Sequence, residues 1–469
     1  MEYSDLRGFI SAAKTIGQLK IIEGADWRSE IGAITFLAKK KDEIPALLFR
    51  KIKDYPEDYK ILANAAHSLK RLALILRTPM EDRPIEFIKS WKERMKKIDP
   101  IPAKKVKDGP VLENMQTGKD VDIYKFPTPK WHELDGGRYI GTGNIVITRD
   151  PDEGWVNLGT YRVMIHDKDT LAFYISPGKH GRIHREKYFS RKQNCKVAIS
   201  FGHDPLLTLV GGTEQPYGVC EYDYAGGICG HPIEVIEGEY TGLPIPAHSE
   251  IAIEGEGLFD ESRLEGPFGE WTGYYASSTR NEPVIKIKNI MHRDNPILLG
   301  YPPSRVAPSA TLRSALIWNE LETMGLPDVK GVWCHPYAGH RLFTVISIKQ
   351  RYPGHAKQAV TLASQCHAGA YTGRYVVVVD DDIDPSNIND VIWAMATRSD
   401  PAESIDILRR CWSGALDPFI PMDKKGHNSK ALIEATRPYE RLKDFPIAVD
   451  VSKGLAEKVT KKWNEVLKP

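Results

Sequence analysis

The chain has 469 residues and a net charge of +2, from 64 lysine and arginine against 62 aspartate and glutamate side chains. This balance excludes the strong basic excess that is typical of nucleic-acid-binding proteins. The most apolar run, Val376 to Val379, is far too short to span a bilayer, and Met1 to Lys20 lack the apolar core of a signal peptide. The six cysteines form no CxxC pair, which argues against a zinc ribbon or a disulfide framework. We therefore expect a cytoplasmic protein of two or three domains, with no membrane span and no nucleic-acid partner.

Helical patterns dominate the first part of the chain. Apolar residues at helical spacing predict helices over 4–17, 31–41 and 84–98, and residues 45–49 predict a short strand. The next stretch, 99–110, contains three prolines and several lysines without periodicity. We therefore expect an N-terminal α/β region over residues 1–105.

The middle of the chain changes to short β-rich runs separated by glycine and proline turns. One helix is expected, near 182–191. This pattern of many short strands and turns predicts a β-barrel or sandwich over residues 106–301. The expected strands cover 144–148, 160–166, 171–175, 196–201, 233–240, 251–254 and 283–290.

From residue 302 onward, strands and helices alternate, which predicts a mostly parallel sheet covered by helices over residues 302–469. The last expected helix, 452–467, carries Leu455, Val459, Trp463 and Val466 on one stripe. That stripe must be buried on its own domain or on a partner subunit. The expected helices are 309–324, 355–367 and 385–398, and the expected strands are 342–349 and 375–379.

Two acidic segments are candidates for chemistry. Leu264 to Glu270 holds two carboxylates, Glu265 and Glu270, around two glycines and a proline. Such a turn can place the two groups at unequal depths and separate their pKa values, although a solvated turn is the plainer interpretation. Asp380 to Asp384 follows a buried strand and would suit Mg²⁺ or a phosphorylated substrate, or else a strand exit with Asp384 as the cap of the next helix.

Several common motifs are missing. There is no Walker loop or GxSxG elbow, and the glycine-rich stretch Gly136 to Gly143 lacks the GxGxxG pattern of a dinucleotide site. His180 and His184 lie four residues apart, but Gly181 stands where an HExxH zinc site needs glutamate.

Six ordered strings carry a resemblance to a known family. The chain resembles the UbiD family of prenylated-flavin-dependent decarboxylases, in its aromatic and heteroaromatic acid branch. The strings cover nearly the whole length of the chain: Trp155 to Arg162, Ser176 to His180, Glu221 to Gly227, Leu264 to Tyr274, and Tyr352 to Lys357 with Asp380 to Pro385.

The resemblance implies an α+β fold with an N-terminal α/β region, a central split β-barrel that binds the flavin, and a C-terminal α/β domain for oligomerisation. It implies prenylated FMN (prFMN) as the cofactor, supplied by a flavin prenyltransferase. It also implies a Mn²⁺ ion held by Asn157, His180 and Glu221, with Glu239 as a weaker alternative to Glu221. Oxygen and imidazole ligands suit Mn²⁺ or Mg²⁺ better than zinc, and K⁺ is a further candidate ion. The implied cofactor-binding residues are Asn157, Gly159, Thr160, Tyr161, Arg162, Lys179, His180, Glu221 and Lys357.

The family's catalytic network corresponds to Arg162, Glu265 and Glu270. Arg162 would keep Glu265 ionised, and Glu270, with less positive charge near it, would protonate the product carbon after CO₂ leaves. His335 and His340 are candidates for contacting a ring substituent, with a structural role as the alternative.

The resemblance therefore predicts a reversible, non-oxidative decarboxylase of an aromatic or heteroaromatic acid that acts as a homodimer or hexamer. Three alternatives stay open at this stage. They are a carboxylase in the cell, an FMN oxidoreductase on a split barrel, and a non-catalytic subunit of a larger decarboxylase.

Overall fold

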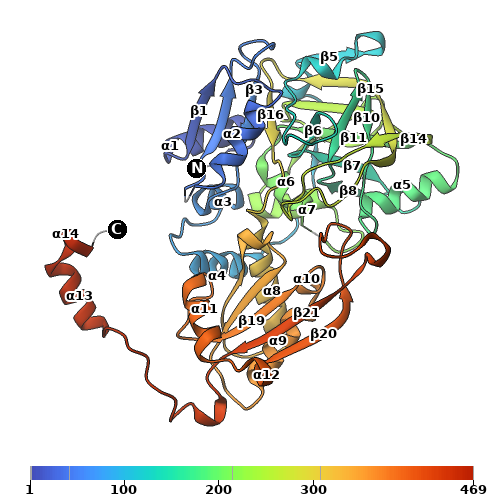
Figure 1. Cartoon of the computed structure of the whole chain (residues 1–469). Helices are drawn as coiled ribbons and strands as arrows, with labels where there is room; N and C mark the ends of the chain where they lie inside the picture. The colour runs from blue at the N-terminus through green and yellow to red at the C-terminus, as the bar shows by residue number, and fades with distance from the viewer. Residues whose placement is uncertain (1–2, 42, 214, 307, 468–469) are drawn as a thin grey trace.

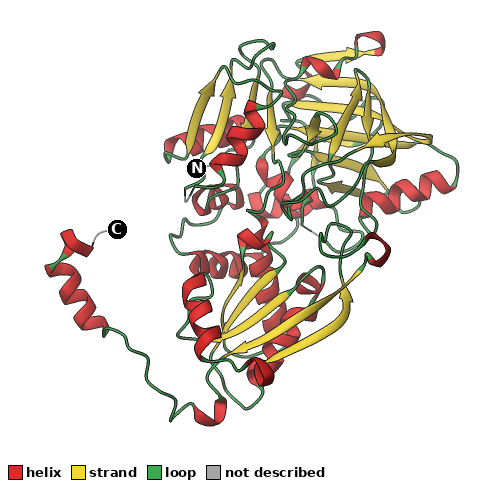
Figure 2. Cartoon of the chain, viewed as in Figure 1, coloured by secondary structure: helices red, strands yellow, loops and turns green. Residues whose placement is uncertain are grey.

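The computed structural model describes residues 3–41, 43–213, 215–306 and 308–467. The chain forms an N-terminal α/β unit, a central β-rich unit and a C-terminal α/β unit, followed by a separate tail (Figure 1). Strands fill the central unit, while helices flank the sheets of the other two (Figure 2). The α+β class expected from the sequence is confirmed.

The N-terminal unit has a four-stranded sheet in the order β1-β2-β3-β16. Its last strand arrives from the far end of the central unit and pairs with β3 in parallel. The bounds are β1 Leu19–Glu23, β2 Ala46–Arg50, β3 Lys60–Ala63, β16 Ile297–Gly300, α1 Leu6–Thr15, α2 Glu30–Ala38, α3 Leu69–Leu76 and α4 Pro84–Met95. The three helices predicted in this region are thereby confirmed.

The central unit is a curled sheet in the order β6-β9-β10-β15-β14-β11-β7-β8, with β5 paired to β15. A separate, smaller sheet has the strand order β13-β12-β4. The bounds are β4 Lys104–Lys105, β5 Asn114–Thr117, β6 Tyr139–Gly141, β7 Ile145–Arg149, β8 Val156–Gly159, β9 Val163–Asp167, β10 Thr170–Ala172, β11 Cys195–Phe201, β12 Glu234–Glu237, β13 Pro244–Pro246, β14 Ile251–Glu265 and β15 Arg280–His292.

The prediction of one helix in the central unit was wrong. Besides α5, His180–Ser190, the chain forms α6, Pro205–Gly211, and α7, Glu221–Cys229. The apolar run of α6 is buried on all sides, so it shows no amphipathic period. In α7 the Gly226-Gly227 pair lies directly against the backbone of Asp99 and Ile101, a tertiary contact that no local pattern predicts.

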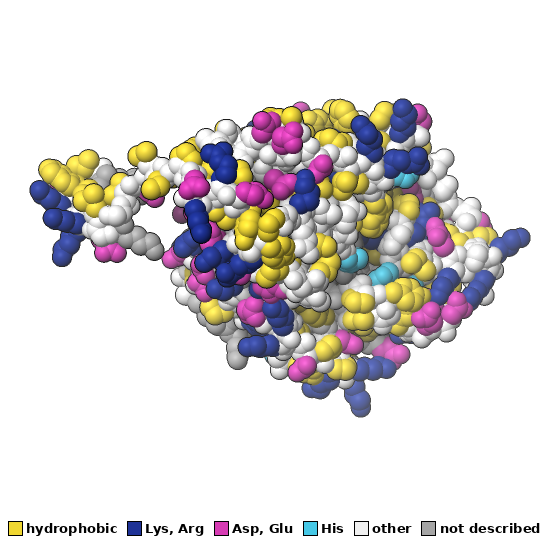
Figure 3. Space-filling model, turned by 90° about the horizontal axis from the view of Figure 1, so that it is seen from below, with side chains coloured by type: hydrophobic (Ala, Val, Ile, Leu, Met, Phe, Trp, Pro, Cys, Tyr) yellow, Lys and Arg dark blue, Asp and Glu magenta, His cyan; other side chains and the backbone are white. Residues whose placement is uncertain are grey.

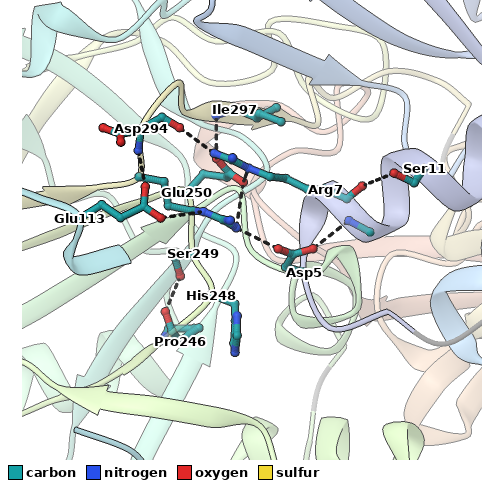
Figure 4. Close-up of polar contacts among 12 residues, drawn as sticks. Asp5, Arg7, Ser11, Glu113, Pro246, His248, Ser249, Glu250, Asp294 and Ile297 are labelled. Atoms are coloured by element: carbon teal, nitrogen blue, oxygen red, sulfur yellow. Dashed lines mark hydrogen bonds and ion pairs between the residues drawn. The ribbon is translucent and has the colours of Figure 1, made fainter. Parts of the chain in front are cut away.

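Helix α1 is fixed to the central unit by a charged cluster (Figure 4). Arg7 donates through two nitrogens to Glu250, at 2.8 Å each, and the Glu250 side chain is completely buried. Arg293 donates to Asp5 at 2.8 Å, and the backbone N–H of Ile297, the first residue of β16, donates to Glu250 at 3.2 Å. The cluster therefore joins α1, the start of β14 and the entry to β16.

The C-terminal unit has a sheet in the order β17-β18-β19-β21-β20, in which β18, β19 and β21 run parallel and the two edge strands run antiparallel. The bounds are β17 Val329–Cys334, β18 Phe343–Ile348, β19 Tyr375–Asp380, β20 Ile405–Trp412, β21 His427–Ala435, α8 Ser309–Thr323, α9 His355–Gln365, α10 His367–Ala370, α11 Ile388–Thr397 and α12 Pro401–Ser404.

The acidic segment after β19 forms ion pairs. Arg398 donates to Asp380 at 3.0 Å and to both oxygens of Asp382 at 2.7 Å. The prediction that α11 starts at Pro385 with Asp384 as its cap was wrong. The helix begins three residues later, and the side chain of Asn387 caps it, while Asp384 accepts from the backbone N–H of Ser386 in the turn before it.

The tail beyond the C-terminal unit stands clear of the rest of the molecule. It ends in α13, Lys453–Lys462, and α14, Asn464–Leu467. The predicted apolar stripe is exposed, with Trp463 at 52% and Val466 at 75% of full exposure. Figure 3 shows hydrophobic and basic side chains together on this projecting arm. In the described part of the chain, the stripe therefore stays largely exposed to solvent.

Candidate active site

Glu265 and Glu270 lie at the two ends of one turn. Glu265 is the last residue of β14, and the chain then turns through Gly266, whose φ of +90° favours glycine. The backbone N–H of Glu270 donates to the carbonyl oxygen of Tyr274 at 3.1 Å, which holds the second carboxyl group in a tight loop. Glu265 is completely buried and Glu270 is 8% exposed.

Arg162 contacts both carboxylates but does not treat them alike. Its Nε and Nη2 donate to the two oxygens of Glu265 at 2.9 and 2.7 Å, whereas only Nη1 donates to Glu270, at 2.5 Å. The guanidinium group lies over the rings of Tyr174 and Phe268, 4.4 and 5.4 Å from their centroids. Arg162 therefore bridges the pair, with two hydrogen bonds to Glu265 and one to Glu270.

The surroundings of Glu270 shift its pKa. Burial raises the pKa of Glu270, and the nearby charge of Glu265 raises it further, while Arg162 acts in the opposite direction. The two carboxylates raise the pKa of Arg162, so the bridge stays positively charged. Two carboxylates and one arginine favour retention of one proton, and Glu270 has the fewer donors to stabilise its anion.

A cavity of about 280 Å³ opens onto this network. Its lining includes Arg162 and Glu270, together with Leu416 from the loop between β20 and β21. The C-terminal unit therefore supplies part of the wall. The lining residues are Thr142, Asn144, Thr160, Tyr161, Arg162, Tyr174, Ser176, Phe268, Glu270, Tyr301, Pro303 and Leu416.

Tyr161 contacts the two segments that carry the expected metal ligands Asn157 and His180. Its hydroxyl oxygen accepts from Asn157 Nδ2 at 3.4 Å and from the backbone N–H of Gly181 at 3.1 Å. The ring packs so closely that a Cβ at Gly159 would lie 2.1 Å from it. Glycine at position 159 leaves room for this ring. Through Tyr161, the end of β8 contacts the start of α5, where His180 is the first helical residue.

Glu221 reaches the same place from α7. Its Oε2 accepts from the backbone N–H of Leu158, next to Asn157, at 2.8 Å. Burial raises the pKa of Glu221 to about 7. Glu239, the alternative ligand, is exposed in the turn between β12 and β13.

These observations test the fit of a divalent cation. A bound cation supplies the counter-charge that stabilises the ionised form of a buried carboxyl group with a raised pKa. An amide oxygen, an imidazole and a carboxylate form a ligand set that suits Mn²⁺ or Mg²⁺. Among the described residues no three His, Cys, Asp or Glu side chains cluster as a metal site, so Asn157 would have to supply the third ligand.

The remaining expected residues divide into two groups. Thr160 lines the cavity, and Lys179 is the residue directly before α5, next to His180. Lys357 does not join them, because it lies on α9 and pairs with Asp406 and with Glu434, the latter at 2.6 Å. Its position gives no support to a contact with the cofactor phosphate.

The two histidines considered for substrate contact lie outside the cavity lining. His340 packs against Trp271, with ring centroids 5.2 Å apart, and His335 packs against Phe343 and Tyr337. Their contacts fit the structural alternative.

Sequence reasoning missed Tyr139, whose hydroxyl group donates to Glu265 Oε1 at 2.9 Å. The only available signal was its place inside the glycine-rich stretch 136–143, which fits no nucleotide-binding motif. Leu416 was missed as well. It follows the cavity residues between Thr142 and Glu270 by at least 146 positions in sequence, and nothing local marks so distant a neighbour.

Three family models match the chain in order. They describe the N-terminal, Rift-related and C-terminal domains of 3-octaprenyl-4-hydroxybenzoate carboxy-lyase, and they match residues 10–91, 104–306 and 309–435. These matches define the class of protein as a carboxy-lyase.

Curated relatives agree over most of the chain. It is 32% identical over 445 residues to pyrrole-2-carboxylic acid decarboxylase of Pseudomonas aeruginosa, which covers 91% of this chain and 89% of the relative. It is also 32% identical to phenolic acid decarboxylase of Bacillus subtilis, covering 93% of each. The chain belongs to the UbiD family of decarboxylases.

Solved structures share the whole fold. The UbiD-class enzyme HmfF of Pelotomaculum thermopropionicum, in complex with FMN, matches with a TM-score of 0.88 at 27% identity, covering 98% of this chain and 100% of that one. An evolved dimeric form of the same enzyme, in complex with prFMN, matches with a TM-score of 0.84 at 26% identity and the same coverage. Among the described residues, no helix is both long enough and apolar enough to cross a membrane.

Proposed function

We propose that this enzyme catalyses the reversible, non-oxidative decarboxylation of an aromatic or heteroaromatic carboxylic acid with prFMN. The observation that carries the proposal is the Arg162 bridge between Glu265 and Glu270 at the wall of a cavity. The named activities of the pyrrole and phenolic acid relatives support this class of substrate.

Prenylated FMN, when bound, would accept the electrons released with CO₂, since no side chain of the site can do so. The cofactor complexes of the HmfF structures support this assignment. Tyr161, Thr160 and Lys179 would line its binding site, and Asn157, His180 and Glu221 would hold a Mn²⁺ or Mg²⁺ ion beside its phosphate.

The protein's own residues would handle the proton. The carbon–carboxylate bond breaks and CO₂ leaves, after which Glu270 donates its proton to the same carbon atom. Glu270 is then an anion, and Arg162 stabilises it until a proton returns from solvent. Each turnover thus consumes one proton and one carboxylate, and releases one CO₂ and the protonated ring product. The reverse sequence would carboxylate the ring at high CO₂.

We further infer that the enzyme acts as a homodimer or hexamer in the cytoplasm and receives its cofactor from a flavin prenyltransferase. The exposed apolar stripe of α13 and α14 supports a subunit contact. Carboxylation as the direction in the cell stays an alternative, because the same groups serve both directions.

The test uses protein co-expressed with a flavin prenyltransferase and purified without oxygen. CO₂ release is followed over pyrrole, furan, hydroxybenzoic and cinnamic acids, for the unchanged enzyme and for Glu270→Gln. We expect turnover on one ring class and a loss of at least about 100-fold in the variant, with the flavin still bound. Full activity of Glu270→Gln would refute the proton donor, and NAD(P)H-driven redox cycling without CO₂ release would favour an FMN oxidoreductase.

A further inference from the structure

The glycine-rich stretch that matched no nucleotide motif packs against the turn between the two catalytic glutamates. The backbone N–H of Gly136 donates to the carbonyl oxygen of Pro267 at 2.7 Å. Asp135 Oδ1 accepts from the backbone N–H of Gly269, the residue before Glu270, at 2.9 Å. A Cβ at Gly136 would lie 1.9 Å from the carbonyl oxygen of Gly266, so only glycine permits this approach.

Tyr139 is held rigidly at the end of this stretch. It is the first residue of β6 and is completely buried. Its ring packs on Phe268 with centroids 4.1 Å apart, and Trp131 Nε1 donates to its carbonyl oxygen at 2.9 Å. The hydroxyl group consequently has a fixed direction, and it donates to Glu265 Oε1 at 2.9 Å.

The tyrosine gives Glu265 a third donor. Arg162 supplies two, and Glu270 receives only one from the same arginine. Each donor to a carboxylate favours its ionised form. Burial raises the pKa of Tyr139, and the charge of Glu265 raises it further, so the phenol stays a neutral donor at any working pH.

We propose that Tyr139 is a positioning residue for decarboxylation, which holds Glu265 as an ionised acceptor so that the transferable proton resides on Glu270. The inference rests on the roles proposed above for the two glutamates. Tyr139 does not line the cavity itself, and its hydroxyl group acts through Glu265.

Other charged groups around Glu265 must be considered for any pH effect. Arg280 stands opposite Glu265 in the β14–β15 register but pairs with Glu282 at 2.7 Å. Replacement of Tyr139 by phenylalanine changes none of these charges, so it isolates one hydrogen bond. The titratable or charged groups that face the site are Asp135, Arg162, His166, Glu270, Arg280 and Glu282.

The central variant is Tyr139→Phe, and the matched control is Tyr240→Phe, which removes a tyrosine-to-glutamate hydrogen bond with Glu256 elsewhere on the same sheet. For Tyr139→Phe we expect kcat to fall about 10-fold with KM changed less than about twofold, since a hydrogen bond to a charged group is lost. The acid limb of the kcat–pH profile should move to higher pH, because Glu265 then accepts a proton more readily. Tyr240→Phe should leave both kcat and the profile unchanged.

Two further measurements keep the test decisive if Tyr139→Phe folds poorly. Replacement of Tyr139 by 3-fluorotyrosine, a stronger donor of similar size, should move the acid limb to lower pH. Infrared spectra of the flavin-free Glu270→Gln variant report protonation of Glu265 without turnover, and 3-fluorotyrosine at position 139 should move that protonation to lower pH.

An unshifted acid limb in both Tyr139 variants, or an equal shift in Tyr240→Phe, would overturn the inference. Failure of the proposed function is a separate result, since it appears as full activity in Glu270→Gln. An inactive Glu270→Gln with an unchanged Tyr139→Phe would overturn the role of Tyr139 alone.

Discussion

Arg162 and Glu265 form a bidentate ion pair, in which two nitrogens of one guanidinium group face two oxygens of one carboxylate at 2.9 and 2.7 Å. The planar fork of arginine fits this geometry, whereas the ammonium group of lysine does not. The third nitrogen, Nη1, is thereby aimed at Glu270. The position of Glu270, the proposed proton donor, thus depends on how Glu265 holds the arginine.

Arg162→Lys is therefore expected to lower kcat by about 100-fold while the charge is kept, because strong charge-assisted bonds are lost. Steady-state CO₂ release checks this. Arg263→Lys is a suitable control, since Arg263 also bridges two carboxylates, Asp167 and Glu261, but lies half-exposed. If both variants lose activity equally, geometry at Arg162 is not the cause.

The pH dependence of turnover should report Glu270. Its pKa is raised by burial, and the donor must be protonated to act, so kcat should be retained at pH values where an ordinary glutamate is ionised. Turnover should then fall as pH rises through this raised pKa. A kcat–pH profile of the prFMN-loaded enzyme tests the sign, and a rate that rises on that limb would contradict it.

Glu221→Gln should weaken metal-assisted flavin binding. The substitution keeps the shape and removes the negative charge that a divalent cation needs. We expect Mn²⁺ to tighten FMN binding in the unchanged protein and to have at least about 10-fold less effect in the variant, since even the residues that only orient metal ligands commonly matter by that factor. Fluorescence titration measures this, and Glu239→Gln, which changes an exposed glutamate, should behave as the unchanged protein does.

Removal of residues 445–469 should lower the oligomeric state. The tail exposes Leu455, Val459 and Trp463 and packs on nothing within its own described chain, so burial on another copy would explain the stripe. Light scattering after gel filtration gives the mass. An unchanged mass, with Trp463→Lys also unchanged, would show that the stripe does not hold subunits together.

Glu250→Ala should destabilise the fold by about 3 kcal/mol, because it leaves Arg7 beside a buried site without its carboxylate and Arg293 with Asp5 as its remaining close partner. Chemical denaturation measures the loss. The control is Glu23→Ala, which removes an exposed pair with Lys51 and should cost less than about 1 kcal/mol. Equal losses of unfolding free energy would mean that the buried cluster stabilises the fold no more than the exposed pair does.

Local patterns predicted those parts of the fold whose residues alternate between core and solvent. Helices α1 and α4 have a buried stripe and an exposed face, and both were found from the sequence. Helix α6 is almost entirely apolar, so its sequence shows no helical period of apolar and polar residues. Strand β14 runs to Glu265, although only its first residues have the sequence pattern of a strand.

The candidate site could be foreseen only in part for the same reason. Glu265 and Glu270 share one turn and are visible together in the sequence. Their contacts with Arg162 and Tyr139 come from segments more than 100 residues away, and no spacing rule predicts such a contact. The resemblance to a family named Arg162, while Tyr139 needed the folded chain.

The placement of β16 has a consequence for how this enzyme can be divided. The strand that closes the N-terminal sheet is made of residues 297–300, so a fragment ending near residue 105 would expose the edge of β3 where its parallel neighbour belongs. The first and second units thus share a sheet as well as the buried Glu250. Domain exchange between relatives would have to carry both units together, with the crossover placed after residue 300.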